Sequence, residues 1–141
     1  MGVCPETMWP YDVTKFKQKP PKSCYDIAVK NEVESYSPVT QTLEQLRGCL
    51  VAGYPVVFGI TLYDSFQTQQ VEQTGIVPTP QLTETVDGGH CMVLVGYDDS
   101  KQWFIVRNSW GDSWGDKGYC YIPYDYFLKM ASDLWMIKLV E

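Results

Sequence analysis

The sequence predicts an α+β fold that is built mostly of antiparallel β-strands, with one or two short helices. One segment, residues 40–53, has apolar residues at helical spacing. Other segments are rich in β-branched and aromatic residues, as strands are. Two of these segments are separated only by the polar turn DDSKQ, which indicates an antiparallel hairpin. The predicted strands cover residues 27–37, 55–63, 91–97, 103–108, 118–123 and 134–140.

Length and composition are those of one globular domain, residues 1–141, in which 45% hydrophobic residues supply a core. The net charge is −6 and no basic run occurs, which argues against nucleic acid as a partner because phosphate contacts need clustered Lys and Arg. No apolar stretch approaches the length of about 20 residues that spans a bilayer, so no membrane contact is predicted. The first residues lack the basic and apolar regions of a signal peptide, and the sequence assigns no compartment.

The helix predicted over residues 40–53 has recognisable ends. Thr40 or Thr42 can cap its N-terminus with a hydroxyl group, and Gly53 is suited to a left-handed stop. We expect this helix to pack on the core and to have no chemical role. Its apolar stripe consists of Leu43, Leu46, Leu50 and Val51.

The remaining segments have weaker patterns. Residues 1–25 are rich in proline, so no long helix is expected there. Residues 64–87 form a long polar loop that contains two prolines. A short helix is predicted over residues 125–132.

Five cysteines occur, an odd number that leaves at least one thiol unpaired. Cys91 and Cys120 lie in apolar strand-like runs, where buried free thiols are expected. Cys4 and Cys24 lie in irregular segments and can pair with each other or with a partner absent from the chain. No closely spaced cysteine pair suggests metal ligation, so neither a metal nor a cofactor is predicted.

The hairpin makes a prediction about the only histidine of the chain, His90. If the turn is centred on Asp99, His90 and Asn108 are equally far from it along the chain and therefore face each other. Opposed residues in a hairpin have Cβ atoms about 5 Å apart on the same face of the sheet. A shift of one residue in this register would break the direct pairing.

A histidine bonded to an Asn amide oxygen has a fixed tautomer and orientation. That pair is the base-and-orienter half of a nucleophilic triad, as in Cys-His-Asn peptidases. The alternative is a partly buried histidine that is merely satisfied by its neighbour. The two glycines before His90 and the glycine- and tryptophan-containing loop after Asn108 favour the catalytic interpretation.

The stretch GGHCMVLVGYDDSKQWFIVRNSWGDSWGDKGYCYI resembles the histidine strand of papain-like cysteine peptidases and the Asn-Ser-Trp-Gly-x-x-Trp-Gly block that follows it. WPYD at residues 9–12 is similar to the Tyr-Pro-Tyr region of that family, so the resemblance covers almost the whole chain. It implies the mostly antiparallel, β-barrel-like right-hand domain of the papain fold. The implied activity is hydrolysis of peptide bonds in a protein or peptide substrate.

The resemblance also implies roles for individual residues. His90 would be the general base, and Asn108 would orient it. Trp110 would shield the His–Asn bond and line the substrate cleft. Gly59, Gly89 and Cys91 would line that cleft as well. Cys24 looks like the family cysteine whose disulfide partner lies outside the present chain.

The nucleophile of the family is absent from the sequence. Its C-G-[SA]-C-[WY] motif stands about 130–150 residues before the histidine and asparagine, which here falls before residue 1. We therefore expect that the chain alone is inactive and that an N-terminal segment supplies the Cys and the oxyanion-hole Gln. The alternatives are a catalytically inactive papain-fold binding module and a truncated gene product. The missing half should also leave an apolar face exposed, through which the chain can self-associate.

Overall fold

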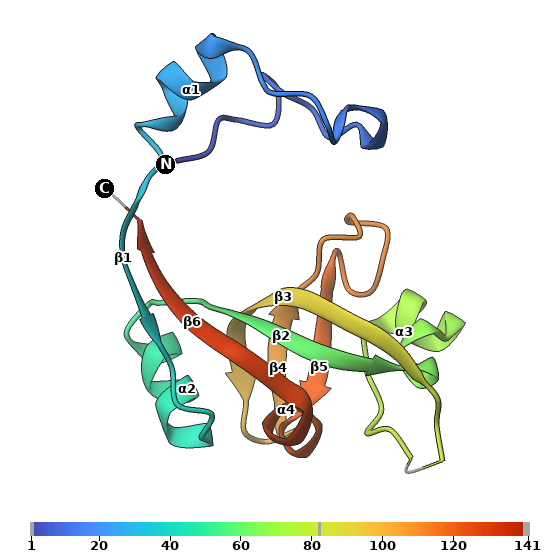
Figure 1. The fold of residues 1–141 in the computed structure, drawn as a ribbon. Helices are drawn as coiled ribbons and strands as arrows, with labels where there is room; N and C mark the ends of the chain where they lie inside the picture. Colours follow the sequence, from blue (N-terminus) through green and yellow to red (C-terminus); the bar gives the residue numbers. More distant parts are fainter. Residues whose placement is uncertain (1, 82, 140–141) are drawn as a thin grey trace. The chain divides into compact units, whose positions relative to one another are not determined.

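A computed structural model of the protein describes residues 2–81 and 83–139 (Figure 1). The chain divides into two compact units, residues 1–36 with 137–141 and residues 37–136. Each unit is described by itself. The sequence-based prediction of a single domain over residues 1–141 stays a prediction.

The first unit contains a 3-10 turn η1 (Val13–Lys15), helix α1 (Lys22–Ala28) and most of strand β1 (Val33–Pro38). The sequence predicted a strand from residue 27 onward, which was wrong for residues 27 and 28 because they end α1. No long helix was expected in residues 1–25, and α1 is short. Proline disfavours a helix interior but is tolerated at its start, and Pro21 is the N-cap of α1. The proline-rich stretch therefore ends at the residue before α1.

The second unit is built on a sheet in which four antiparallel pairings are described, β6–β2, β2–β3, β3–β4 and β4–β5. The strand order β1-β6-β2-β3-β4-β5 gives the sheet two separate edges, so it is open and does not close into a barrel (Figure 1). The predicted α+β class is confirmed. The strands are β2 (Val56–Tyr63), β3 (Val86–Asp98), β4 (Trp103–Arg107), β5 (Tyr119–Pro123) and β6 (Ala131–Leu139).

Four short α-helices occur in the described part of the chain, where one or two were expected. Helix α2 (Leu43–Val51) is the predicted one, and the Thr42 hydroxyl accepts its N-terminal hydrogen bond from Gln45 N. Helix α4 (Tyr124–Met130) is also close to its prediction. Helices α1 and α3 were not predicted.

The segment predicted as a loop over residues 64–87 is partly helical. It contains the 3-10 turn η2 (Asp64–Gln67) and helix α3 (Gln69–Thr74). Thr68 caps α3 by accepting a hydrogen bond from Val71 N, and Gly75 ends it in the left-handed conformation. These cap residues are local signals, but the short polar helix between them has no apolar stripe.

The core of the second unit lies on one face of the sheet. Side chains along β2 alternate between buried and half-buried, as a strand with one covered face requires. Phe58 of β2, Phe104 of β4 and Phe127 of α4 are fully buried together, with ring centroids 4.6 and 4.7 Å from that of Phe127. This packing holds α4 against the strands that carry the candidate site.

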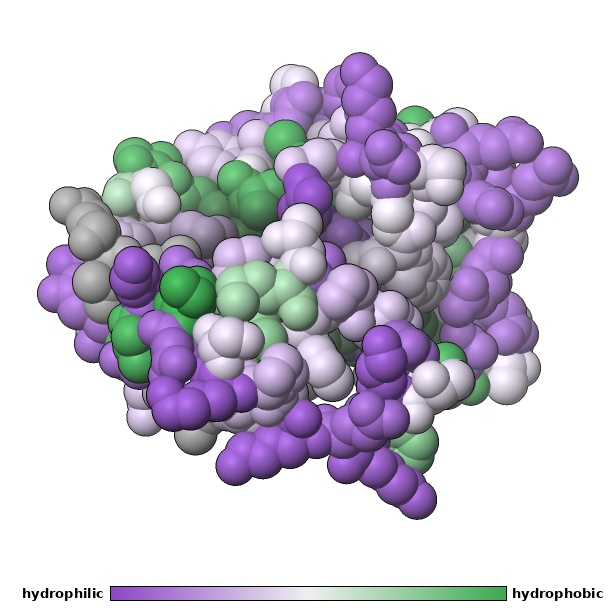
Figure 2. All heavy atoms as spheres, turned by 90° about the horizontal axis from the view of Figure 1, so that it is seen from above, coloured by the Kyte–Doolittle hydropathy of each residue, from purple (hydrophilic) through white to green (hydrophobic). Residues whose placement is uncertain are grey.

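The outer surface is mixed in character. On the face shown in Figure 2, hydrophobic residues form several separate patches among hydrophilic ones. The more exposed apolar side chains include Tyr11, Val13 and Phe16 of the first unit and Val51 of the second. Within residues 2–81 and 83–139, no helix has the length and apolar character needed to cross a bilayer.

Gly75 is expected to be intolerant of substitution. Its φ is +70°, and a Cβ there would lie 2.5 Å from Tyr119 O and 3.0 Å from Asp116 N. Gly75→Ala should therefore lower the free energy of unfolding by about 2–3 kcal/mol, because left-handed strain and a backbone clash add. Gly53 is the matched control, since its φ is +84° but no atom lies within 4 Å of its Cβ position. Gly53→Ala should cost about 1 kcal/mol in urea unfolding, and equal costs for the two variants would contradict the clash.

Candidate active site

His90 and Asn108 come together as a hydrogen-bonded pair beside the end of β4. His90 lies in β3 opposite Ile60 of β2. Asn108 follows directly after the last residue of β4, Arg107, and is largely buried. The His90 Nε2 atom is 2.8 Å from Asn108 Oδ1. The predicted contact between the two side chains is therefore present.

The predicted strand register, however, is wrong. Asp98 pairs with Trp103, and after a bulge between Leu94 and Gly96 the residue opposite Val93 is Arg107. His90 is thus not opposite Asn108 in the ladder. Asn108 lies beyond the paired part of β4 and reaches the imidazole from there.

The turn explains the difference in register. It spans residues 99–102, so it is centred beyond Asp99. Asp98 Oδ1 accepts hydrogen bonds from Ser100 N and Lys101 N, and Gln102 adopts a left-handed φ of 57°. A longer turn that is stabilised by its own side chain moves every downstream residue of β4 relative to β3.

A second hydrogen bond shows which ring nitrogen of the histidine carries a hydrogen. Ser109 N donates to the same Asn108 Oδ1 atom at 2.8 Å, so this atom must be the amide oxygen and not the nitrogen. An amide oxygen only accepts, so His90 Nε2 carries the hydrogen. The lone pair of the neutral ring is therefore on Nδ1, the nitrogen that faces away from Asn108.

Aromatic rings gather beside His90. The Trp110 ring centroid is 5.1 Å from that of His90. Trp110 in turn packs edge-on against Phe66 and Trp114, which are stacked on each other. Phe66 comes from η2, in the segment that the sequence assigned to a loop. A lone phenylalanine among polar residues was the only sign of its role.

The loop between β4 and β5 is held in shape by its glycines. Gly111, Gly115 and Gly118 all have positive φ angles, which side chains disfavour. Asn108 N donates to Gly118 O at 2.9 Å, and Gly118 N donates to Trp114 O at 2.8 Å. The Asn-Ser-Trp-Gly-x-x-Trp-Gly block is thus the first part of a turn that returns to Asn108 at Gly118.

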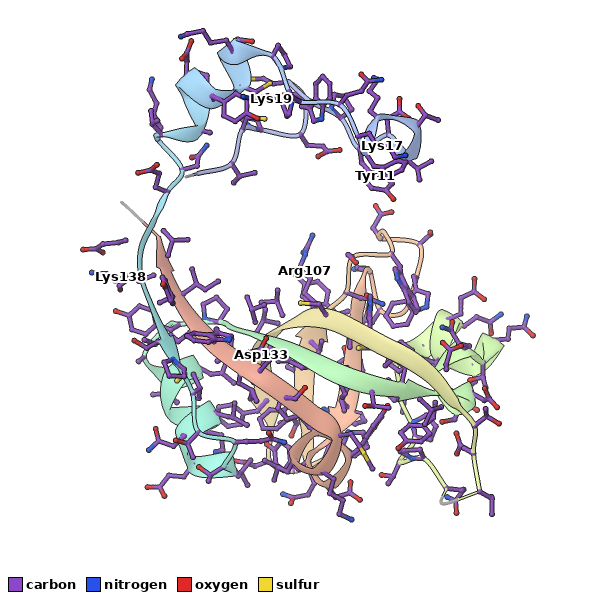
Figure 3. The ribbon with its side chains drawn as sticks, viewed as in Figure 1. Tyr11, Lys17, Lys19, Arg107, Asp133 and Lys138 are labelled. Atoms are coloured by element: carbon purple, nitrogen blue, oxygen red, sulfur yellow. The ribbon has the colours of Figure 1, made fainter. Side chains whose placement is uncertain are left out.

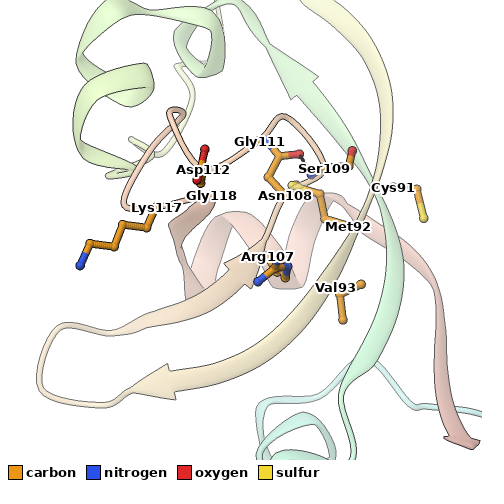
Figure 4. Close-up of a pocket in the computed structure, with 10 residues that line it drawn as sticks. All are labelled: Cys91, Met92, Val93, Arg107, Asn108, Ser109, Gly111, Asp112, Lys117 and Gly118. Atoms are coloured by element: carbon orange, nitrogen blue, oxygen red, sulfur yellow. Dashed lines mark hydrogen bonds between the residues drawn. The ribbon is translucent and has the colours of Figure 1, made fainter. Parts of the chain in front are cut away.

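A hollow of about 430 Å³ adjoins Asn108 (Figure 4). Cys91 and Arg107 line it, and Figure 3 shows Arg107 projecting from β4. The Arg107 guanidinium donates to the Tyr119 hydroxyl at 2.7 Å. Asn108 Nδ2 is buried and has no hydrogen-bond partner among the described residues. The amide therefore uses its oxygen for His90 while its NH2 group remains unsatisfied.

The other three predicted cleft residues lie on neighbouring strands. Gly59 of β2 is paired with Cys91 of β3, so these two are adjacent on one face. Gly89 directly precedes His90, and no atom lies within 4 Å of the position a Cβ would take there. Cys91 is exposed, which corrects the expectation of a buried thiol. It points to the face of β3 opposite His90 and so avoids the core.

Cys91 and Cys120 should differ sharply in thiol reactivity. Burial raises the pKa of Cys120 to about 12, so little reactive thiolate forms near neutral pH. Cys91 is exposed beside the candidate site. We expect Cys91 to be alkylated by iodoacetamide at least about 100-fold faster than Cys120 in the folded chain. Peptide mass mapping over time measures both rates, and in urea the difference should vanish.

Comparison with known proteins gives the class of the molecule. The sequence matches the family described as papain family cysteine protease over residues 1–133. This chain therefore belongs to the papain family of cysteine proteases. The match agrees with the α+β fold and with the resemblance seen in the sequence.

Individual relatives agree with this assignment. An uncharacterized peptidase C1-like protein of Acanthamoeba polyphaga mimivirus is 39% identical over 99% of this chain, which covers 48% of that protein. Cathepsin S of Bos taurus is 31% identical over 84% of this chain, which covers 34% of it. Xylellain, a cysteine protease from Xylella fastidiosa, superposes with a TM-score of 0.87 at 37% identity, over 99% of this chain and 57% of xylellain. The chain thus spans only part of the length of these three relatives, 48%, 34% and 57%.

Proposed function

We propose that this chain supplies the His/Asn half of a papain-like cysteine endopeptidase that hydrolyses peptide bonds. The observation that carries the proposal is the bond from His90 Nε2 to Asn108 Oδ1, which leaves Nδ1 available as a base. Membership of the papain family supports the reaction type. The aromatic cover by Trp110 supports it further, because a shielded hydrogen bond is stronger than one exposed to water.

The geometry suits proton transfer at Nδ1. In the proposed enzyme, His90 Nδ1 accepts the proton of a cysteine thiol, and the thiolate attacks the substrate carbonyl carbon. The imidazolium then returns the proton to the leaving amine. In the second half-reaction Nδ1 takes a proton from water, which hydrolyses the thioester. Asn108 holds the ring in the same orientation through both steps.

The proposed reaction also needs a cysteine nucleophile. No hydrogen bond joins His90 to a cysteine within residues 2–81 and 83–139. Cys91, its neighbour in sequence, faces the opposite side of β3. We therefore propose that a separate N-terminal peptidase segment provides the Cys and the Gln, and that the chain alone is inactive.

Gly59, Gly89, Cys91 and Trp110 are proposed as the walls of the substrate cleft on this side. Cys91 lines the hollow beside Asn108, and the space at Gly89 is open. The open space at Gly89, directly before His90, supports a binding surface for an extended peptide next to the imidazole, and the hollow at Cys91 lies beside Asn108.

Complementation tests the proposal. The purified chain is assayed against fluorogenic peptides alone and after fusion to the part of the Xylella fastidiosa protease that it does not cover. We expect hydrolysis only in the fused form, and we expect replacement of the supplied cysteine by serine to abolish it. Hydrolysis by the chain alone that His90→Ala abolishes would contradict the need for a second segment. A folded fusion with no activity would contradict the proposed function and favour a binding module.

A further inference from the structure

The N-terminal segment of the first unit lies against the end of helix α1. Val3 N donates to Asn31 O at 3.3 Å, and Asn31 Nδ2 donates to Val3 O at 3.0 Å. Gly2 is so close to this turn that a Cβ would overlap the carbonyl groups of Ala28 and Asn31. Residues 2–4 are therefore held in one position relative to α1.

This arrangement places two thiols next to each other. Cys24 lies in α1 and is only 3% exposed. Cys4 is the residue after Val3, and its side chain interacts with the Cys24 thiol. The Cys24 thiol also donates to Met8 O at 3.9 Å, so the chain after Cys4 returns to this thiol at Met8. Burial and the neighbouring Cys4 raise the pKa of the Cys24 thiol.

We propose that Cys4 and Cys24 are a redox pair that forms an intramolecular disulfide and so fixes the N-terminal segment to α1. The family resemblance pointed instead to a partner for Cys24 outside this chain. The contact with Cys4 favours the internal pair. The proposal is independent of the peptidase activity, because it concerns only residues of the first unit.

The bond can form by exchange with a small disulfide such as glutathione disulfide. The more accessible Cys4 attacks one sulfur as a thiolate and releases one glutathione thiolate. Cys24, once deprotonated, attacks the Cys4 sulfur of the mixed disulfide and releases the second. Two electrons pass from the cysteines to the oxidant, and the two thiol protons end on the two glutathiones. The high pKa of Cys24 makes Cys4 the first to react.

The disulfide would close a loop that is otherwise largely exposed. Tyr11, Lys17 and Lys19 belong to this loop and are labelled in Figure 3. The loop also includes η1 and the exposed side chain of Phe16. Cross-linking the ends of a loop lowers the entropy of its open states, so the oxidised form should open less often.

Peptide mapping tests the pairing. The full chain is equilibrated with mixtures of reduced and oxidised glutathione, quenched with acid, alkylated and digested with trypsin. We expect the peptide ending at Lys15 to be joined to residues 23–30, with a mass about 2 Da below the sum of their thiol forms. Cys49→Ser should leave this species intact, whereas Cys4→Ser should remove it. Alkylation of both Cys4 and Cys24 at every glutathione ratio would overturn the proposal, as would linkage of Cys24 to another cysteine.

Hydrogen exchange tests the consequence separately. Exchange of the Val3 N–H, which is bonded to Asn31 O, should slow about tenfold on oxidation. The same treatment should change nothing in Cys4→Ser, whose partly exposed side chain is a mild site to replace. Exchange of Leu46 N–H in α2 is the internal control. A linked peptide without slower exchange at Val3 would refute the structural role of the bond.

Discussion

Replacing His90 by alanine in the fused, active form should lower kcat by about 10⁴-fold or more, because both proton transfers pass through its Nδ1 atom. Asn108→Ala should lower kcat less, by about 10²-fold, since the base remains but its orientation and tautomer are no longer fixed. Initial rates at saturating peptide measure both effects. Circular dichroism checks that each variant is folded.

The control for these substitutions lies on helix α2. Gly48 has no atom within 4 Å of the position a Cβ would take, so Gly48→Ala should fold normally and keep full activity. If His90→Ala retained more than about one-tenth of the activity, the base would have to be another group. If Asn108→Ala were as inactive as His90→Ala, Asn108 would be needed for more than orientation. The two variants thus separate the base from its positioning residue.

The local parts of the fold were predictable from the sequence because each rests on nearby residues. The pattern from Val56 to Tyr63 predicted a strand, and the structure has one there. Thr42 and Gly53 marked the ends of α2 correctly. The contact between His90 and Asn108 was also anticipated.

The register was not predictable, although the contact that it was meant to explain was correct. The register depends on the left-handed conformation of Gln102 and on the bulge between Leu94 and Gly96. Neither feature is indicated by the residue types at these positions. A glutamine rarely adopts a positive φ, so a shorter turn was the natural assumption. The side chain of Asn108 reaches His90 from beyond the strand end, a route that strand pairing rules do not describe.

Other differences between the sequence-based prediction and the structure arise because tertiary surroundings decide the outcome. Helix α3 has no apolar stripe and is recognisable only by its caps, Thr68 and Gly75. Cys91 lies in an apolar run but on the uncovered face of β3, so its surroundings, and not its neighbours in sequence, decide its exposure. Phe66 reaches the site from a segment without strand or helix periodicity.

Phe127→Ala should cause the largest loss of stability among the substitutions considered, about 3–5 kcal/mol in the free energy of unfolding. Phe127 is fully buried and packs with Phe58 and Phe104, so truncation removes a large apolar surface and leaves a cavity between α4 and two strands. Urea unfolding followed by circular dichroism measures the change.

Phe16 provides the matched control, because the same side chain is 78% exposed there. Phe16→Ala should change the free energy of unfolding by less than about 0.5 kcal/mol. Equal losses for the two variants would show that the Phe127 site relaxes around the cavity or that Phe16 is covered in solution.

The Phe127 cavity also bears on activity, because it lies beside β2, which carries Phe58 and pairs Ile60 with His90. In the fused form, Phe127→Ala should therefore reduce activity at elevated temperature, where the folded fraction falls, well before it does so at low temperature.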